Sequence, residues 1–303
     1  MDPILRKSLA AAKAGHEGVL AGFGLERYIV YGPQMGASLR QWEERLTLRG
    51  TGDAAYENIR SISDASGEEV GLYSGTISRH ALAEVIELVD EVGLIDEAPY
   101  RIEPDDMAIR MSLIVGGVEV VKYIGVNEPE RVQKLQPLFR RLQEIELRVR
   151  NHPTRTLGVQ MSTPDVAEIG MQVMPIHMRF VNRGTDSYWV NHPRSLGREV
   201  YYDRCSLNYG YRPPVQPGIT PMQIEVMETV LRPDTDEGLQ LIWLPAGASQ
   251  DTTLFAEVNF HQPGEFLLRA AYSNYSGEDA VGGVPRMRGC VFSAEKSISV
   301  VSA

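Results

Sequence analysis

Tyrosine and arginine residues gather in two segments of the C-terminal half, residues 201–214 and 273–288, and they form the most informative candidate site. Both residue types are enriched in protein–protein interfaces, because they join a large contact area to hydrogen bonding. We therefore predict two partner-binding loops. The alternative is that the tyrosines pack on a sheet and that the segments only join strands. The side chains expected to bind a partner are Tyr209, Tyr211, Arg212, Tyr275, Arg286 and Arg288.

Two acidic clusters, residues 103–106 and 234–237, are the candidates for acid–base catalysis or for cation binding. A catalytic pair needs two carboxylates in unlike environments that face one substrate, and neighbours in a loop meet neither condition by spacing alone. The second cluster resembles the start of a calcium loop but lacks its later ligands. We expect both clusters to be solvated turns.

Histidine spacing and short motifs give no catalytic or metal signature. No two of the six histidines are three or four residues apart, so a metal site would need distant residues. Only His192 and His261, both in predicted loops, are candidates to meet in space. The nucleophile elbow, the phosphate-binding loop, the His-Glu-x-x-His motif and the Cys-x-x-Cys motif are all absent. The sequence predicts no catalytic residue, no cofactor and no metal.

Composition and charge exclude several classes of protein. The chain has 303 residues, of which 43% are hydrophobic and 23% are charged, so it is globular rather than disordered. No apolar run approaches the ~18 residues that a membrane helix needs. The net charge is −10, and acidic residues exceed basic residues in both halves. We therefore expect no membrane and no nucleic acid among its partners.

The N-terminus and the cysteines favour a cytoplasmic protein. Residues 1–10 include two basic side chains, but no continuous apolar segment of a signal peptide follows them. A chain from which a leader had been removed would look the same. Cys205 and Cys290 both fall on predicted strands. Two buried thiols are the default expectation, and a disulfide is the alternative in an oxidising compartment.

The first half combines helices with strands. A helix is expected at residues 2–22, with Ile4, Leu5, Leu9 and Leu20 facing inward. Strands are expected at residues 27–31, 45–49, 55–61 and 70–77. Ser78 is a helix cap, and Gly93 is the left-handed stop of that helix. The apolar face of this helix consists of Leu82, Val85, Ile86 and Val89.

A β-hairpin is predicted around Gly116-Gly117, because both glycines adopt positive φ readily. A two-residue turn would place Val115 opposite Val118 and Leu113 opposite Val120. Asn127 then caps a helix that Pro137 kinks or restarts. These elements predict an α+β domain at residues 26–150, in which an antiparallel sheet has helices on one face. The N-terminal helix, residues 1–25, precedes this domain.

The second half predicts an all-β sandwich at residues 159–303, after a linker at residues 151–158. Short alternating runs end at turns such as Asn182-Arg183-Gly184, Pro245-Ala246-Gly247 and Pro263-Gly264. This alternation of short strands and turns is typical of an immunoglobulin-like sandwich. Trp189 and Trp243 fall inside strand patterns, and we expect them in the core.

Both halves resemble known families through their turn residues. Residues 26–149 resemble a bacterial family of small domains of unknown function, on Gly75-Thr76-Ile77-Ser78, Asp105-Asp106 and the closing helix near Leu135. Residues 159–303 resemble bacterial immunoglobulin-like domains, including those of intracellular proteinase-inhibitor type. The second resemblance is carried by residues 180–184, 244–247 and 263–266. The resemblances imply folds, and the first family brings no known activity.

A non-catalytic protein-binding protein, of the immunity, inhibitor or adaptor type, is therefore the expected function. Its ligand would be a protein held by sandwich loops, because long loops on a rigid scaffold are common binding sites. Two alternatives stay open. One is an enzyme with a site between domains, and the other is a structural subunit that pairs through a sheet edge. The partner's identity and the oligomeric state stay open as well.

Overall fold

The computed structural model describes residues 3–31, 42–59, 69–98, 107–193, 196, 204–213, 227–233, 241–274 and 280–302. The chain forms two compact units. The first contains Met1–Asn58 and Leu72–Pro153, and the second contains Ile59–Gly71 and Thr154–Ala303. Strand β7, Pro153–Ser162, begins where a linker at residues 151–158 was expected.

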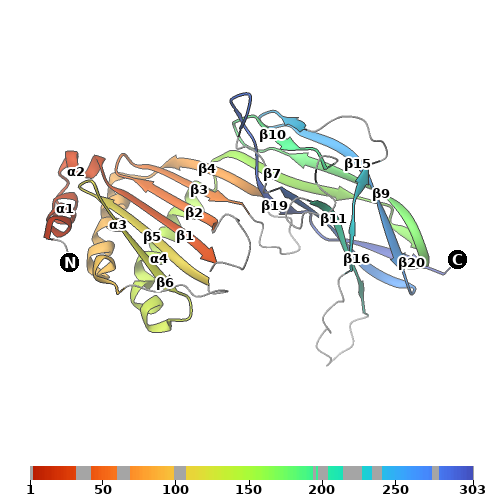
Figure 1. Cartoon of the computed structure of the whole chain (residues 1–303), viewed down its shortest axis with the longest axis horizontal. Coiled ribbons are helices and arrows are strands. Elements are labelled where there is room, and N and C mark those ends of the chain that lie inside the picture. Colours follow the sequence, from red (N-terminus) through yellow and green to blue (C-terminus); the bar gives the residue numbers. More distant parts are fainter. Residues whose placement is uncertain are drawn as a thin grey trace. The chain divides into compact units, whose positions relative to one another are not determined.

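The first unit is a sheet with helices packed against it. The strands lie in the order β4-β3-β2-β1-β5-β6, and α3 and α4 lie behind them in Figure 1. Its elements are α1 (Pro3–Lys13), α2 (Glu17–Ala21), β1 (Gly24–Tyr31), β2 (Trp42–Arg49), β3 (Asp53–Asn58), β4 (Val70–Thr76), α3 (Arg79–Glu91), the 3-10 turn η1 (Leu94–Asp96), β5 (Met107–Val115), β6 (Val118–Gly125) and α4 (Pro129–Val149).

Helix α3 begins and ends as its sequence predicts. The Ser78 hydroxyl accepts a hydrogen bond from the backbone N–H of Ala81 at 3.1 Å, which satisfies a donor that the first turn would leave unpaired. Gly93 has φ of 63°, the left-handed conformation that stops the helix. The predicted apolar face is buried and joins the core of the unit. The cap, the stop and the apolar face of α3 therefore agree with the prediction from the sequence.

The hairpin between β5 and β6 has the predicted register. Val115 pairs with Val118, and Leu113 pairs with Val120. Gly116 and Gly117 both have positive φ, 60° and 78°, so the turn has the twist that suits two antiparallel strands. A Cβ on Gly116 would also come within 2.3 Å of the Ser8 hydroxyl. The first glycine is therefore needed for conformation and for space.

Four helix expectations differ from the structure. The single helix at residues 2–22 is divided into α1 and α2, because Gly15 adopts a positive φ of 77°. Ile4 was expected inward, but it is 63% exposed. Helix α4 starts after Glu128 rather than Asn127, with Pro129 in its first turn, where a missing N–H costs nothing. The helix then runs through Pro137 instead of restarting there.

The described part of the second unit contains two larger sheets and two small ones. One larger sheet has the order β13-β15-β9-β7, and the other has the order β12-β11-β16-β20-β8, with β19 also pairing with β16. The small sheets are the pairs β10-β14 and β17-β18. The strands that follow β7 are β8 (Val166–Glu168), β9 (Gly170–Val181), β10 (Tyr188–Asn191), β11 (Arg204–Arg212), β12 (Met227–Val230), β13 (Arg232–Pro233), β14 (Leu241–Leu244), β15 (Ser249–Phe260), β16 (Gly264–Asn274), β17 (Ala280–Val281), β18 (Val284–Pro285), β19 (Gly289–Phe292) and β20 (Lys296–Val301).

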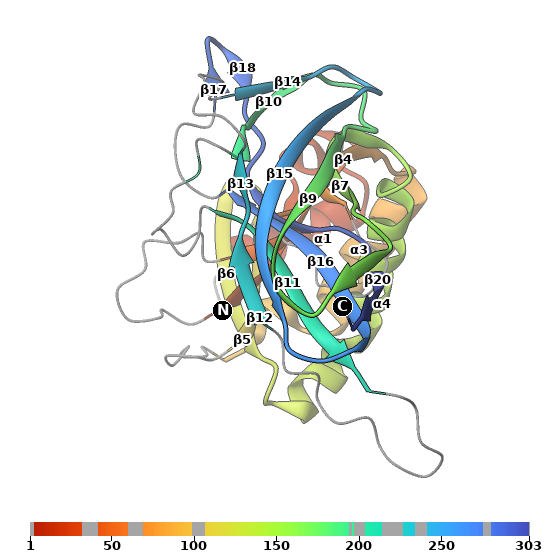
Figure 2. The ribbon, with the colours of Figure 1, turned by 90° about the vertical axis from the view of Figure 1, so that its right-hand side faces the viewer.

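The two larger sheets share one hydrophobic core and form a β-sandwich. Figure 2 shows β9 and β15 crossing β11 and β16. Phe180 of one sheet meets Tyr272 of the other edge to face, with ring centroids 5.2 Å apart, and Phe260 meets Phe266 at 5.0 Å. All four rings are buried. The pairing is antiparallel except between β8 and β20, which run parallel.

The expected fold class, an α+β N-terminal domain followed by an all-β immunoglobulin-like sandwich, is wrong. The described residues contain twenty strands and four α-helices, so the fold is mostly β with large antiparallel sheets. The error has a physical origin. A long amphipathic helix repeats its apolar period many times, whereas a strand of a few residues repeats its period only two or three times. The helices were therefore easier to recognise in the sequence than the strands, and the sheet is larger than the sequence indicated.

Cys205 and Cys290 are free thiols, and both are buried. Cys205 on β11 pairs with Tyr272, and Cys290 on β19 pairs with Ser273, so the two cysteines lie on opposite sides of β16. Strands separated by a third strand are roughly 10 Å apart, beyond the reach of a disulfide. Burial raises the pKa of the Cys205 thiol, which makes this cysteine unreactive.

None of the helices in the described residues is both long enough and apolar enough to cross a membrane.

Candidate partner-binding surface

Tyr209 and Tyr211 are packing residues of strand β11, not residues of a loop. Tyr209 is 7% exposed, and its ring meets Phe260 edge to face at 6.1 Å. Tyr211 meets Phe266 at 5.5 Å and covers Gly264, where an added Cβ would come within 2.7 Å of the tyrosine ring. The alternative reading of the tyrosines, that they pack on the sheet, therefore fits their places in the structure.

The other predicted residues lie at two opposite ends of the sandwich. Arg212 is exposed at the end of β11, where it pairs with Glu265 at 3.4 Å. Arg286 and Arg288 precede β19, whose Gly289 pairs with Asn274. Glu265 and Asn274 are nine residues apart on β16, which corresponds to roughly 30 Å. Tyr275 lies outside the described residues. The five described side chains therefore do not form one site.

A polar cluster holds Arg286 in place at its end of the sandwich. The Arg286 guanidinium donates to the Asn191 side-chain oxygen at 3.3 Å, and the Asn191 amide donates to Asn274 at 3.0 Å. The Tyr272 hydroxyl donates to the backbone carbonyl of Asn191 at 2.8 Å. Tyr272 and Asn274 are buried, whereas Asn191 and Arg286 are half-buried. We call Asn191, Tyr272, Asn274 and Arg286 the Asn191 cluster.

Two tryptophans lie beside the Asn191 cluster. Trp189 and Trp243 are opposite each other on β10 and β14, with ring centroids 4.8 Å apart and planes tilted by 54°. The backbone N–H of Met287 donates to the Trp189 carbonyl at 2.8 Å, which fastens the Arg286 segment to β10. Trp243 is 39% exposed, and Trp189 is half-buried. Both were expected in the core, and this expectation is wrong.

Several strands end or begin at this end of the sandwich. Strand β10 ends at Asn191, β14 begins at Leu241, β11 begins at Arg204, and β16 ends at Asn274. The pairs Asn191 with Leu241 and Arg204 with Ser273 place these termini together, and β10 and β14 lie together at the top of Figure 2. Trp189, Trp243 and the Asn191 cluster therefore lie where chain connections enter and leave a rigid sandwich, a common place for a binding site.

The two histidines considered as a pair, His192 and His261, do not meet. His192 lies 3.4 Å from Thr252, and the His261 ring contacts Phe266. Residues 252 and 261 are nine positions apart on β15 and just after it, again roughly 30 Å. The acidic clusters at residues 103–106 and 234–237 lie outside the described residues. In the ranges that the structure describes, no three His, Cys, Asp or Glu side chains are placed to hold a metal ion.

Among the described residues, three carboxyl groups have a lowered pKa, and each has a cation beside it. Burial alone would raise the pKa of Glu97, but hydrogen bonds from Lys134 and Arg131 outweigh burial and lower it. Hydrogen bonds from Lys296 and from Arg179 lower the pKa of Asp165 and of Asp251. A general acid must hold its proton near the working pH. These carboxylates stay ionised, which fits structural ion pairs.

The tryptophans were missed although strand alternation indicates their direction. Tyr188 and Val190 flank Trp189, and Ile242 and Leu244 flank Trp243; all four flanking residues are buried. Successive side chains of a strand point to opposite faces, so a tryptophan between two core residues must face outward. The Asn191 cluster left no comparable signal, because its members lie on three separate segments of the chain.

No protein-family model and no curated protein sequence matches this chain. The resemblance of residues 26–149 to a bacterial domain family therefore has no support from family models. Solved structures match weakly. The CARDB domain of PF1109 from Pyrococcus furiosus is 12% identical with a TM-score of 0.24, over 50% of this chain and 91% of that one. The β-glucosidase EmGH1 from Erythrobacter marinus is 12% identical with a TM-score of 0.24, over 48% of this chain and 16% of the enzyme.

AvmM, which catalyses macrocyclization in alchivemycin A biosynthesis, is 14% identical with a TM-score of 0.22, over 48% of this chain and 87% of that one. These scores are too low to carry an argument about fold or function.

Proposed function

We propose that this chain is a non-catalytic protein-binding protein of the immunity, inhibitor or adaptor type. The contact surface consists of Trp189, Trp243 and Arg286, with Asn191 behind the arginine. A cytoplasmic location and an immunoglobulin-like sandwich, of the kind found in intracellular proteinase inhibitors, belong to the same proposal.

The observation that carries the proposal is the exposure of Trp243 beside a positioned arginine. Tryptophan and arginine dominate the binding energy of protein interfaces when they are well supported from behind. Here Trp243 rests on Trp189, and Arg286 is hydrogen-bonded to Asn191. Side chains that are already fixed lose less conformational entropy when a partner binds.

The charge of the chain supports a basic partner. The net charge is −10, and opposite charge speeds the encounter of two proteins in a way that added salt weakens. The tryptophan contact itself depends little on salt. We therefore expect salt to slow association more than it changes dissociation.

Affinity capture with the full chain tests the function. The chain should recover a protein from lysate of its source cell at low salt and less of it at high salt. Trp243→Ala and Arg286→Ala should each reduce recovery, whereas Arg212→Ala should not. Arg212 is the matched control, because it is an exposed, ion-paired arginine at the opposite end of the sandwich.

If Trp243→Ala, Arg286→Ala and Arg212→Ala all recovered the same amount of partner, the result would contradict the proposed surface. Recovery of no protein at either salt concentration, together with turnover in a broad substrate screen, would contradict the function and favour an enzyme instead.

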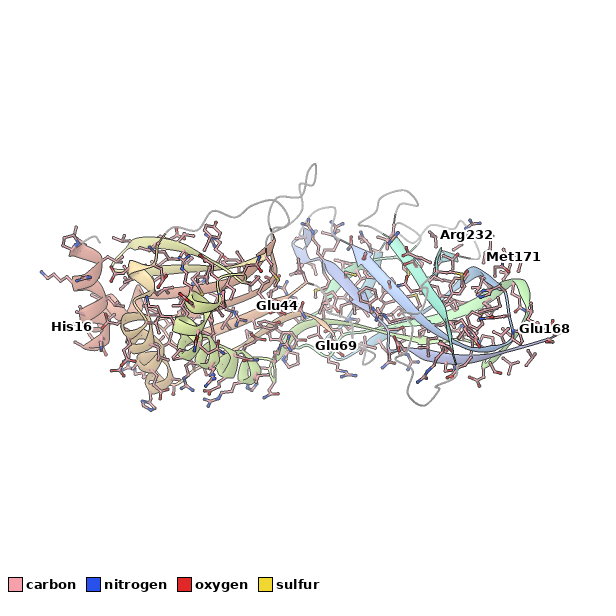
Figure 3. The ribbon with its side chains drawn as sticks, turned by 90° about the horizontal axis from the view of Figure 1, so that it is seen from below. His16, Glu44, Glu69, Glu168, Met171 and Arg232 are labelled. Atoms are coloured by element: carbon pink, nitrogen blue, oxygen red, sulfur yellow. The ribbon has the colours of Figure 1, made fainter. Side chains whose placement is uncertain are left out.

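Pairing through a sheet is the second candidate, and strand β9 favours it. Met171 and Val173 are 68% and 66% exposed, and Figure 3 shows Met171 at one end of the second unit. Pairing of β9 with β7 ends at His177. Among the described residues, residues 170–176 therefore have β15 on one side and no strand on the other. Pro175 opposes strand addition there, because it has no N–H to donate.

Light scattering on the full chain distinguishes this second candidate. An assembly that Met171→Lys breaks and Trp243→Ala leaves intact would favour pairing through β9.

A further inference from the structure

A pocket of about 360 Å³ opens in the second unit, and its lining contains none of Trp189, Trp243 and Arg286. Charged side chains of both signs line it, namely Glu69, Arg183, Glu295 and Lys296, and Val159, Met161 and Val181 add apolar atoms. Its volume lies in the range of small-molecule sites, from roughly 300 to 1,000 Å³. The residues that line it suit a small ligand with charged and apolar parts.

One wall is an ion pair that the backbone holds in place. Arg183 Nε lies 3.0 Å from a carboxylate oxygen of Glu69, and Figure 3 labels Glu69. The Glu69 side chain crosses Gly158, where an added Cβ would come within 3.0 Å of Glu69 Cγ. Glu69 is 17% exposed and Arg183 is 65% exposed. The carboxylate is therefore the inner member of the pair, and the guanidinium is the outer member.

The turn that carries Arg183 is tightly fixed. The buried Asn182 side chain donates to the carbonyls of Asp186 and Pro245, at 2.9 and 3.0 Å, and accepts from the Gly184 backbone N–H at 2.9 Å. A Cβ on Gly184 would come within 2.3 Å of the Thr154 carbonyl. The Arg183 backbone N–H donates to the Thr156 hydroxyl at 3.1 Å. The backbone of Asn182-Arg183-Gly184, which carries the arginine, is therefore held firmly in place.

The lining also contains a second cation and a second carboxylate. Lys296 donates to Asp165 at 2.6 Å and is 28% exposed. Glu295 is exposed at the rim, and within the described ranges it has no ion pair or hydrogen bond. A guanidinium and an ammonium each have more N–H donors than one carboxylate accepts. Arg183 and Lys296 therefore keep donors for a ligand anion, and Glu295 is available for a ligand cation.

We propose that this pocket binds a small zwitterion, a free α-amino acid or a short peptide with free termini. The ligand carboxylate would lie against Arg183 and Lys296, and its ammonium group would lie against Glu295. The four charges of the lining sum to zero, which favours a ligand that carries both signs over a simple anion. Val159, Met161 and Val181 would contact the ligand side chain.

Calorimetric titration of the full chain tests the pocket, with the twenty free α-amino acids and the dipeptide Ala-Ala as probes. At least one probe should bind. The N-acetylated form and the amidated form of that probe should each bind at least about tenfold more weakly, since each loses one charge that the pocket recognises. A preference for Ala-Ala over every free amino acid would identify peptide termini as the ligand.

Variants locate the binding in this pocket. Arg183→Gln and Glu295→Gln should each weaken binding by about tenfold or more. Gly158→Ala should weaken it as well, because the new methyl group displaces Glu69. Arg179→Gln is the matched control, since Arg179 is an exposed, ion-paired arginine on β9, the strand before the Arg183 turn, and does not line the pocket. Trp243→Ala should leave this binding unchanged, so the pocket and the protein-binding surface fail or succeed separately.

Two results would overturn the proposal. One is the absence of heat from every probe at millimolar concentration. The other is a probe whose affinity is the same for the native chain, Arg183→Gln and Glu295→Gln.

Discussion

The two ends of the sandwich contain the same residue types and use them differently. At the end near Glu265, Tyr209 and Tyr211 pack against phenylalanine rings, and Arg212 is paired on the surface. At the end near Asn274, the buried Tyr272 fixes the backbone of Asn191, and Arg286 is fixed by the Asn191 side chain. One end therefore uses its aromatic residues for the core, whereas the other end supports side chains that face solvent.

The difference shows that composition alone does not locate a binding surface. A segment rich in tyrosine and arginine is equally consistent with a packed strand and with a contact loop. What separates the two is the direction of each side chain relative to the sheet, which strand alternation sets. The second criterion is whether neighbouring residues hold the exposed side chain in place, and only the assembled fold shows this.

Tyr209→Ala should have the largest effect and should act on stability. Its ring is buried between the sheets, and replacing a buried aromatic residue by alanine costs about 3 to 5 kcal/mol. Urea unfolding followed by fluorescence measures the change in the free energy of unfolding. A loss below about 1 kcal/mol, combined with weaker partner binding, would show that Tyr209 is a contact residue. The two ends of the sandwich would then not differ in how they use their aromatic residues.

Trp243→Ala should have the next largest effect and should act on binding. A supported tryptophan in an interface contributes about 2 kcal/mol or more, so partner affinity should fall by about 30-fold. The free energy of unfolding should fall by about 1 kcal/mol or less, since only the cross-strand contact with Trp189 is lost. Surface plasmon resonance and urea unfolding measure the two effects. A large loss of stability with unchanged affinity would make the tryptophan pair a structural feature.

Much of the local structure could be predicted from the sequence. The Ser78 cap, the Gly93 stop and the Gly116-Gly117 turn depend on a few adjacent residues, and their chemistry leaves few choices. The same holds for the turn at Asn182-Arg183-Gly184, because β9 ends at Val181. Fold class depends instead on how many strands one sheet collects, which is a long-range property that the first half does not reveal locally.

The candidate site could be predicted only in part. Arg286 was among the predicted partner-binding residues, but its hydrogen-bond partner Asn191 lies 95 residues earlier in the chain. Glu69 and Arg183 are an ion pair across a similar separation. Contacts of this kind are created by strand pairing, and a single sequence carries no signal for them. The outward direction of the tryptophans, by contrast, was available from alternation.

Asn191→Ala should weaken binding by about 1 kcal/mol, because Arg286 loses the acceptor that holds it. If Asn191 acts through Arg286, the double variant with Arg286→Ala should bind no more weakly than Arg286→Ala alone. A double-mutant cycle from plasmon resonance affinities measures this coupling. Additive effects of the two substitutions would mean that Asn191 contacts the partner itself or only supports the fold.

Arg212→Ala should have the smallest effect of all. The Arg212–Glu265 pair is about half exposed on both sides, and exposed pairs contribute between about 0 and 1 kcal/mol, so the free energy of unfolding should change by no more than about 0.5 kcal/mol. Partner affinity should not change. The variant is informative because Arg212 has the charge and exposure of a contact residue, whereas the partner that holds it is the exposed carboxylate of Glu265. If Arg212→Ala weakened binding as much as Trp243→Ala, support from behind would not be what separates the two ends, and exposed charge would suffice.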